Sequence, residues 1–175
     1  TYNFTNHLIA LEDKFAGKKI DLNKSELTLH KIRTSNTIIA NGHIERFISF
    51  RNNDLPGVML ASSFEKYIHR YGVVPEKEPV IFTNNSSSLS LLKKLISLGC
   101  KPKAYVDSRK KDNIETEIKK ILKDKEIPFF SDAEIEGCDG NKKVETITIR
   151  QGKSFNKLKS SMLCVSGGYN PDIHL

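Results

Sequence analysis

Residues 78–109 constrain the fold of this chain most, because two short apolar runs enclose an amphipathic segment there. Residues 79–82 form the first run, and residues 104–106 form the second, which ends on Asp107. Between them, apolar residues recur at helical spacing at Leu89, Leu92, Leu95 and Ile96. A strand, a helix and a strand in this order are typical of a parallel βαβ unit. We therefore expect an α/β fold built on a parallel sheet.

The turn between the first run and the helix lacks the glycines of a dinucleotide-binding fingerprint. It reads Thr-Asn-Asn-Ser-Ser-Ser over residues 83–88, so every Cβ atom would hold a pyrophosphate away from the backbone. Asp107, at the end of the second run, is nevertheless where such a unit contacts a ribose hydroxyl. Asn84, Asn85 and Asp107 are therefore secondary candidates for cofactor binding. The simpler interpretation is a helix cap followed by a strand-end turn at Asp107 and Arg109.

Apolar periodicity along the rest of the chain predicts further elements. A first helix is predicted within residues 1–16 from the spacing of Leu8, Leu11 and Phe15. Gly72 and Gly99 are expected to stop the helices that precede them. The other predictions are helices over 60–71 and 112–125, strands over 26–32, 37–40, 127–130 and 162–165, a hairpin over 133–150, and a polar loop over 151–159.

The net charge of +7 raises the question of a nucleic-acid partner. Residues 93–125 hold eleven Lys and Arg against five Asp and Glu. Many of these lysines fall on the polar faces of two predicted helices, and no aromatic residues are interleaved with them as a stacking platform requires. We favour a lysine-rich helix face exposed to solvent, and a phosphate-binding patch is the alternative.

Several function classes lack their signature in this sequence. No apolar run approaches the roughly 18 residues of a membrane helix, so we expect no membrane association. Cysteines 100, 138 and 164 form no CxxC pair, which indicates neither zinc nor a disulfide framework and favours a reducing cytoplasmic location. The histidines show no metal-ligand spacing, and no GxSxG elbow is present. We therefore name no catalytic residue and no metal ligand.

Two glycine turns follow apolar runs and bracket the βαβ region. The first contains Gly42, and the second contains Gly167 and Gly168. Backbone without Cβ atoms at a strand end lets a flat ligand approach closely, although ordinary turns would look the same. The neighbouring Glu45 and Arg46 are expected to be a pair of solvated surface charges.

Longer motifs around these turns carry a family resemblance. Residues 38–73, IIANGHIERFISFRNNDLPGVMLASSFEKYIHRYGV, and residues 163–175, LCVSGGYNPDIHL, resemble the α subunit of heterotetrameric sarcosine oxidase. The TNN and VDxR stretches of the βαβ unit also fit that pattern. Three positions depart from it, since the family has Thr, Arg and Trp where this chain has Asn41, Leu55 and Tyr169. Related amine and opine oxidase subunits share much of the pattern, so the resemblance leaves the substrate open.

The resemblance implies the architecture of an FAD/NAD-linked reductase. A three-layer Rossmann-like domain, with a parallel sheet and an added β-hairpin, would be inserted in a larger dinucleotide domain. Residues 1–44 would be a flanking segment of the larger domain, residues 45–165 the inserted domain, and residues 166–175 the return crossover. In the family, the subunit binds NAD through a preceding domain and the return turn. Carried over to this chain, the cofactor-binding candidates are Gly42, Gly167, Gly168 and His174.

The resemblance also implies a function for the whole enzyme. Sarcosine would be oxidised at its secondary amine to glycine and a one-carbon unit, with oxygen reduced to hydrogen peroxide. NAD would belong to the full-length subunit, FAD and FMN to the whole complex, and the other subunits would be the partners, without nucleic acid or membrane. These 175 residues would bind no cofactor alone and act as a catalytically silent scaffold. The alternatives are a free-standing NAD(P)-binding module using Asn84–Ser88 and Asp107, or a non-enzymatic scaffold.

Overall fold

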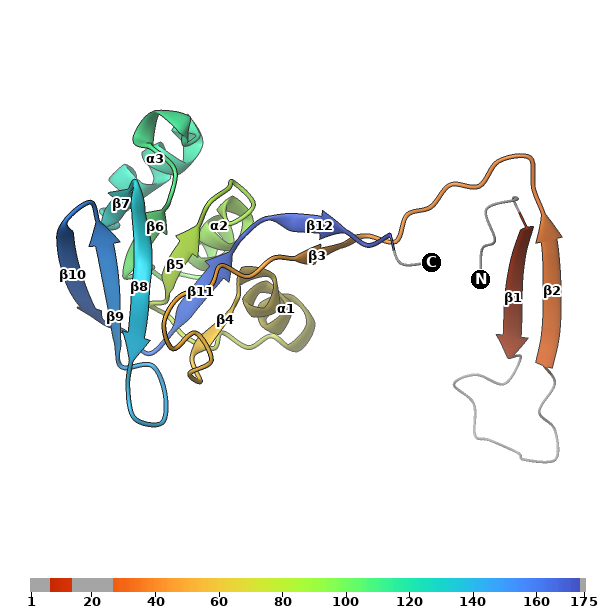
Figure 1. The fold of residues 1–175 in the computed structure, drawn as a ribbon, viewed down its shortest axis with the longest axis horizontal. Helices are drawn as coiled ribbons and strands as arrows, with labels where there is room; N and C mark the ends of the chain where they lie inside the picture. The colour runs from red at the N-terminus through yellow and green to blue at the C-terminus, as the bar shows by residue number, and fades with distance from the viewer. Residues whose placement is uncertain (1–6, 14–26, 174–175) are drawn as a thin grey trace. The chain divides into compact units, whose positions relative to one another are not determined.

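The computed structural model describes residues 7–13 and 27–173, which fall in two compact units (Figure 1). One unit is Ile44–Asn170, and it contains the βαβ region. The other comprises Thr1–His43 and Pro171–Leu175, within which the described residues are 7–13, 27–43 and 171–173. No helix in the described part of the chain has the length and apolarity needed to cross a bilayer.

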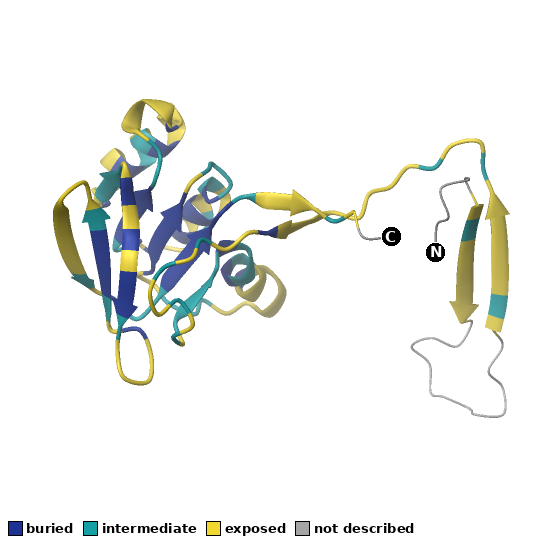
Figure 2. Ribbon diagram, viewed as in Figure 1, coloured by how far each residue is buried: buried dark blue, intermediate teal, exposed yellow. Residues whose placement is uncertain are grey.

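A five-stranded parallel sheet forms the centre of the unit Ile44–Asn170. In spatial order its strands are β4 (Val58–Leu60), β11 (Leu163–Ser166), β5 (Val80–Thr83), β6 (Ala104–Asp107) and β7 (Phe129–Ser131). All neighbouring pairs are parallel, and every residue of β5, β6 and β11 is buried (Figure 2). Strands buried on both faces read as continuous apolar runs, which is why the sequence shows no alternation there.

Three helices pack on one face of this sheet. They are α1 (Ala61–Tyr71), α2 (Leu89–Ser97) and α3 (Thr116–Asp124), with a short 3-10 turn at Lys111–Asn113 before α3. Their apolar stripes meet in one core, to which Phe64, Leu92 and Ile118 each contribute a fully buried side chain. Gly72 ends α1 in the left-handed conformation at φ +66°, as the sequence predicts.

An antiparallel sheet covers the opposite face. It consists of β8 (Ala133–Asp139), β9 (Thr146–Gln151) and β10 (Ser154–Lys159), in the order β10-β9-β8. Its apolar side chains, such as Ile147 and Ile149, form a second core with Phe82 and Val106 of the parallel sheet. Helices, parallel sheet and antiparallel sheet make three layers, which confirms the predicted α/β class with an added hairpin.

The described part of the other unit contains an antiparallel pair of strands, β1 (His7–Asp13) and β2 (Leu27–Arg33). The two short strands β3 (His43–Glu45) and β12 (Tyr169–Pro171) form a further two-stranded sheet. The assignment of residues 1–44 to a larger dinucleotide domain stays a prediction.

Three local predictions are wrong. Residues 7–13 are a strand rather than part of a helix, because pairing with β2 decides the conformation of a segment too short to fix its own period; Phe15 lies outside the described residues. Residues 37–40 are irregular and largely exposed instead of a strand. Residues 151–159 contain β10 rather than only a loop, since the Gly152-Lys153 turn, with Gly152 at φ +58°, brings Ser154 opposite Gln151.

Candidate functional site

The carboxyl ends of β5, β11 and β6 place three polar groups side by side. In the parallel register, Thr83 lies opposite Ser166 on one side and opposite Asp107 on the other. From β5 the chain runs outward through β6 to β7, whereas β11 and β4 lie on the other side of β5. Ligands of open α/β sheets bind at such a reversal of strand order, so this edge is the candidate site.

Asp107 is engaged by Arg109 and is not free for a ribose. Its carboxylate is fully buried and accepts hydrogen bonds from the backbone N–H of Arg109 at 2.9 Å and from Nε at 3.0 Å. The guanidinium Nη2 donates to the second carboxylate oxygen at 2.8 Å. This pairing raises the pKa of Arg109 above its usual range, chiefly through the hydrogen bonds to Asp107. The predicted strand-end turn at Asp107 and Arg109 is therefore present.

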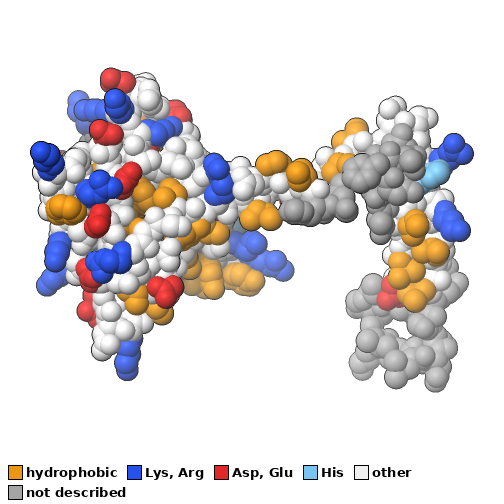
Figure 3. All heavy atoms as spheres, viewed as in Figure 1, with side chains coloured by type: hydrophobic (Ala, Val, Ile, Leu, Met, Phe, Trp, Pro, Cys, Tyr) orange, Lys and Arg blue, Asp and Glu red, His pale blue; other side chains and the backbone are white. Residues whose placement is uncertain are grey.

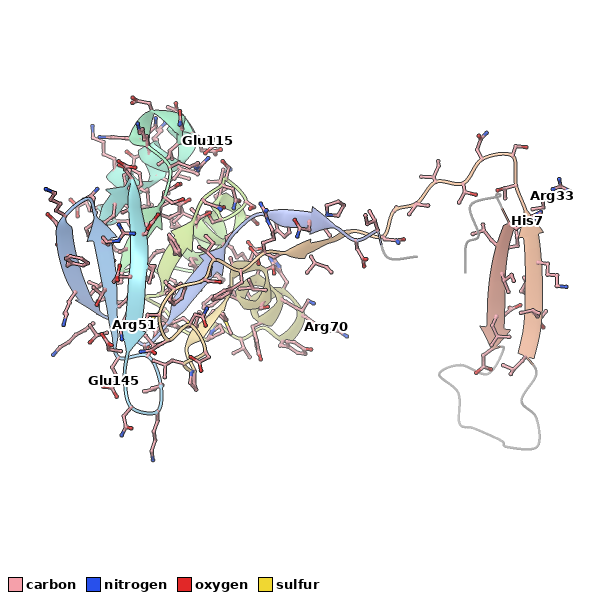
Figure 4. All side chains as sticks on the ribbon, in the orientation of Figure 1. His7, Arg33, Arg51, Arg70, Glu115 and Glu145 are labelled. Carbon is pink, nitrogen blue, oxygen red and sulfur yellow. The ribbon has the colours of Figure 1, made fainter. Side chains whose placement is uncertain are left out.

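Two further side chains complete this ion-pair cluster. The Arg109 guanidinium also donates to the Ser86 hydroxyl at 3.2 Å and lies 3.4 Å from the Glu115 carboxylate. Ser86 in turn donates to Glu115, which lies just before α3 (Figure 4). The hydrogen bond from Ser86 is the largest cause that lowers the pKa of Glu115, and Arg109 adds to this lowering. The cluster thus joins the 83–88 turn, the end of β6 and the start of α3.

A second network closes the edge between β5 and β11. The buried Thr83 hydroxyl lies 3.0 Å from the Ser166 carbonyl oxygen, and the Asn85 amide donates to the same oxygen at 3.0 Å. The Asn85 side-chain oxygen accepts the backbone N–H of Ser87 at 2.8 Å, while the Asn84 side chain accepts from the Asn85 amide at 2.8 Å. The backbone N–H of Ser87 and the side chains of Thr83 and Asn85 are thus satisfied within the protein.

The N-cap residue of α2, Ser88, makes no side-chain cap hydrogen bond, so the helix cap that the sequence predicts is absent at this residue. The Ser88 hydroxyl and the Tyr105 phenol, both buried, lie 2.8 Å apart. Burial raises the pKa of Tyr105 above its usual range, although the bond to Ser88 opposes that shift. With no glycine between residues 83 and 88 and with Asp107 paired, these residues do not fit a dinucleotide held in the manner of a glycine-rich loop.

The turn after β11 packs against the segment that follows β3. Gly167 donates its N–H to the Arg46 carbonyl oxygen at 2.9 Å, and Arg46 donates to the Gly168 carbonyl oxygen at 2.7 Å. A Cβ on Gly167 would stand 2.5 Å from that Arg46 oxygen, and Gly168 has φ +85°. Both glycines are thus required by the backbone, whatever else lies beside them.

The remaining candidates fall in the other unit. Gly42 is exposed at φ +79°, with open space where its Cβ would be, and its carbonyl oxygen accepts the N–H of Asp172 at 3.1 Å. His174 lies outside the described residues. A role for Gly42, Gly167, Gly168 and His174 beside a cofactor stays a prediction.

Glu45 is not the solvated surface charge that the sequence predicts. Its side chain is buried, and one carboxylate oxygen accepts the backbone N–H of Ser62 at 2.8 Å. Ser62 is in the first turn of α1, where a helix presents unsatisfied N–H groups and the positive end of its dipole. Glu45 therefore caps α1 from a distant strand. Local sequence patterns do not predict this contact, because the two residues are 17 positions apart.

No group of three or more His, Cys, Asp or Glu in residues 7–13 and 27–173 is arranged to hold a metal ion. The three cysteines are free and buried. Among the described residues at the strand edge, the charged and hydroxyl groups bind one another, and the arrangement offers structural linkage rather than a nucleophile with an adjacent base.

The chain matches no family model. It is 33% identical over 147 residues to sarcosine oxidase subunit alpha of Rhizobium meliloti (strain 1021), which covers 84% of this chain. It is 29% identical over 151 residues to the subunit of the same name from Corynebacterium sp. (strain U-96), which covers 82%. The chain spans only 14% and 15% of the length of these two relatives. The predicted resemblance to the α subunit of sarcosine oxidase is thereby confirmed.

Solved reductases share the fold. Thioredoxin reductase of T. acidophilum superposes with a TM-score of 0.62 at 14% identity, over 85% of this chain and 49% of that chain. The ferredoxin reductase for the CYP199A2 system of Rhodopseudomonas palustris gives a TM-score of 0.57 at 16% identity, over 84% of this chain and 38% of that chain. These likenesses confirm the predicted FAD/NAD-linked reductase fold class.

Proposed function

We propose that this chain is the inserted Rossmann-like domain, with its two crossovers, of an α subunit of sarcosine oxidase type. One observation carries the proposal: the chain is 33% identical to sarcosine oxidase subunit alpha of Rhizobium meliloti (strain 1021) over 84% of its own length. The three-layer fold supports it, because solved reductases have the same arrangement at low sequence identity.

Within this proposal, the domain acts as a scaffold instead of holding a dinucleotide at its own strand edge. The ion-pair cluster of Asp107, Arg109, Glu115 and Ser86 supports that role. A dinucleotide would have to displace Arg109 from a fully buried carboxylate, which leaves an unpaired charge in the core. The cluster instead links β6 to the start of α3.

The two crossovers are proposed to contact the cofactor of the larger domain. Gly42, Gly167, Gly168 and His174 are the positions assigned to that contact, with NAD as the cofactor of the full-length subunit and FAD and FMN in the whole complex. Of the two that lie in the unit Ile44–Asn170, Gly168 is the better placed, because it has a left-handed backbone in the turn just after the buried strand β11, at the carboxyl edge.

The whole enzyme is proposed to oxidise the secondary amine of sarcosine. Two electrons and two protons leave the amine and its methyl group, the resulting imine takes up water, and glycine and formaldehyde separate. When bound, the flavins would supply the redox chemistry, and oxygen would take up the two electrons and two protons to become hydrogen peroxide. In this chain, no described residue is assigned a proton-transfer role. Other subunits of a hetero-oligomer are the proposed partners, in the cytoplasm, where three free buried cysteines stay reduced.

Peroxide formation from sarcosine tests this function. The full-length subunit assembled with its partners should produce peroxide, and the present chain alone should produce none. If the assembled enzyme oxidised another secondary amine but not sarcosine, sarcosine would be refuted as the substrate. Turnover of sarcosine by the present chain alone would refute the scaffold role.

A free-standing NAD(P)-binding module is the second candidate. The fold that this chain shares with reductases favours it, since the strand-order reversal lies between β5 and β11 as in nucleotide-binding sheets. It requires Asn84, Asn85 and Asp107 to contact a dinucleotide. Saturable NAD binding by this chain, weakened when Asp107 is replaced, would support it over the scaffold.

A further inference from the structure

A basic pocket lies on the surface beside α3, and none of its lining residues belongs to the candidate site. It encloses about 370 Å³ between the 3-10 turn at Lys111–Asn113, the helix α3 and the start of β7. Its lining residues are Lys111, Lys119, Leu122, Lys123, Glu126, Ile127 and Phe129. The pocket lies wholly within the unit Ile44–Asn170.

Positive charge dominates its rim. Three lysines face one carboxylate, that of Glu126, around the opening. The Lys119 ammonium donates a hydrogen bond to the carbonyl oxygen of Lys111 at 3.2 Å. No ion pair joins the side chain of Lys111 or Lys123 to any described residue. Figure 3 shows basic and acidic side chains over the end of the unit that carries α3. The nearby acids Glu117 and Glu115 are engaged elsewhere, by Lys93 at 2.7 Å and by Arg109 at 3.4 Å.

The floor of the pocket is apolar. Leu122 and Ile127 belong to the helix-side core and are 2% and 5% exposed. Phe129 is half-buried and packs against Tyr105 with ring centroids 6.1 Å apart. Because the floor is anchored in the core, it keeps its shape and offers a fixed depression to a side chain from outside. Apolar area at the base and like charges at the rim call for an occupant that is both apolar and acidic.

We propose that this pocket docks an acidic and apolar segment of another polypeptide. One apolar side chain would enter the depression, and neighbouring carboxylates would pair with Lys111, Lys119 and Lys123. A protruding side chain suits a concave pocket, whereas a bilayer surface is flat. Nucleic acid would leave the apolar floor unused, and no exposed aromatic ring lines the pocket for a base to stack on.

This inference rests on the proposed function only for the source of the segment, which would be a partner subunit. The chemistry of the pocket is independent of that function. A binding assay on the present chain therefore tests the pocket alone, and its failure would leave the similarity to sarcosine oxidase and the scaffold role unaffected.

Fluorescence anisotropy with a labelled peptide, Glu-Leu-Glu-Phe-Glu, is the direct experiment. The double substitution Lys111→Glu and Lys123→Glu should weaken binding at least tenfold. Lys142→Glu with Lys153→Glu changes the net charge equally at exposed positions outside the pocket and should leave binding unchanged. Replacing every Glu of the peptide by Gln, or both apolar residues by Ser, should weaken binding as much as the pocket substitutions do. Circular dichroism checks that each variant is folded.

Three results would overturn the inference. They are no binding of the peptide up to millimolar concentration, equal weakening by the two double substitutions, and tighter binding of a short DNA duplex with the same dependence on Lys111 and Lys123. The third result would assign the pocket to nucleic acid.

Discussion

The carbonyl oxygen of Arg46 lies 2.5 Å from the point where Gly167 would carry a Cβ atom. Arg46 follows β3 and Gly167 follows β11, and a 2.9 Å hydrogen bond joins the Gly167 N–H to that oxygen. Any side chain at position 167 would therefore push these two segments apart. A glycine that looks like a ligand contact in the sequence is explained by this close approach of two backbones.

Gly167→Ala should consequently destabilise the chain by about 1–3 kcal/mol, because a backbone carbonyl cannot move aside as a flexible side chain would. The free energy of unfolding in urea measures this. Asn170→Ala, at an exposed position in β12 shortly after Gly167, is the control and should have little effect. An unchanged urea midpoint in Gly167→Ala would show that the fold does not need this close contact.

Asp107→Asn should cost about 3–5 kcal/mol of stability, since it breaks a pair whose carboxylate is fully buried and leaves Arg109 uncompensated. Lys93→Ala removes one partner of an exposed ion pair, Lys93 with Glu117, and should cost about 1 kcal/mol or less. Chemical denaturation of the two variants compares them directly. Equal losses would mean that the ion-pair cluster does not hold the strand edge together.

Stability should fall at alkaline pH partly through Cys138. Burial, followed by the charge of Asp139, raises the pKa of this thiol to about 11 from its ordinary value of 9.0. The native state therefore resists losing the proton, and the stability this gives is present below pH about 9 and is lost as the pH rises toward 11. Urea midpoints measured across this range should fall less steeply in Cys138→Ala. Identical slopes in the two proteins would contradict the assignment.

Acid should destabilise the chain partly through Glu76. Hydrogen bonds from the Ser161 hydroxyl and from the backbone N–H groups of Glu78 and Lys77 lower the pKa of Glu76, although burial opposes this. The native state thus favours the carboxylate, so its contribution is present above the ordinary pKa and is lost as the pH falls through the lowered one. Glu76→Gln should show a flatter fall in thermal midpoint between neutral and acidic pH. A slope as steep as that of the parent chain would assign the acid sensitivity to other groups.

The sequence predicts the βαβ unit well because local patterns determine it. The buried strands β5 and β6 are continuous apolar runs, and Gly72 has the left-handed conformation expected of a helix stop. Long-range contacts could not be read in this way. Pairing with β2 makes a strand of residues 7–13, and contact with Ser62 buries Glu45.

The candidate site, too, was predictable only where its contacts are local in the sequence. The turn at Asp107 and Arg109 involves residues two positions apart, and an acid at a strand end followed by Arg indicates it. Ser86 and Glu115 are 29 positions apart, so nothing local signals that they complete the cluster. The missing glycines of the 83–88 turn were the available sign that this edge departs from a dinucleotide site.

Isothermal titration of NAD into this chain tests whether the carboxyl edge of the parallel sheet is closed by its own side chains. No binding heat is expected up to millimolar NAD, because Asp107 is paired with Arg109 and the 83–88 turn offers no glycine. Saturable binding that weakens in a folded Asp107→Ala variant would instead show that this edge is open to a dinucleotide and would favour the free-standing module.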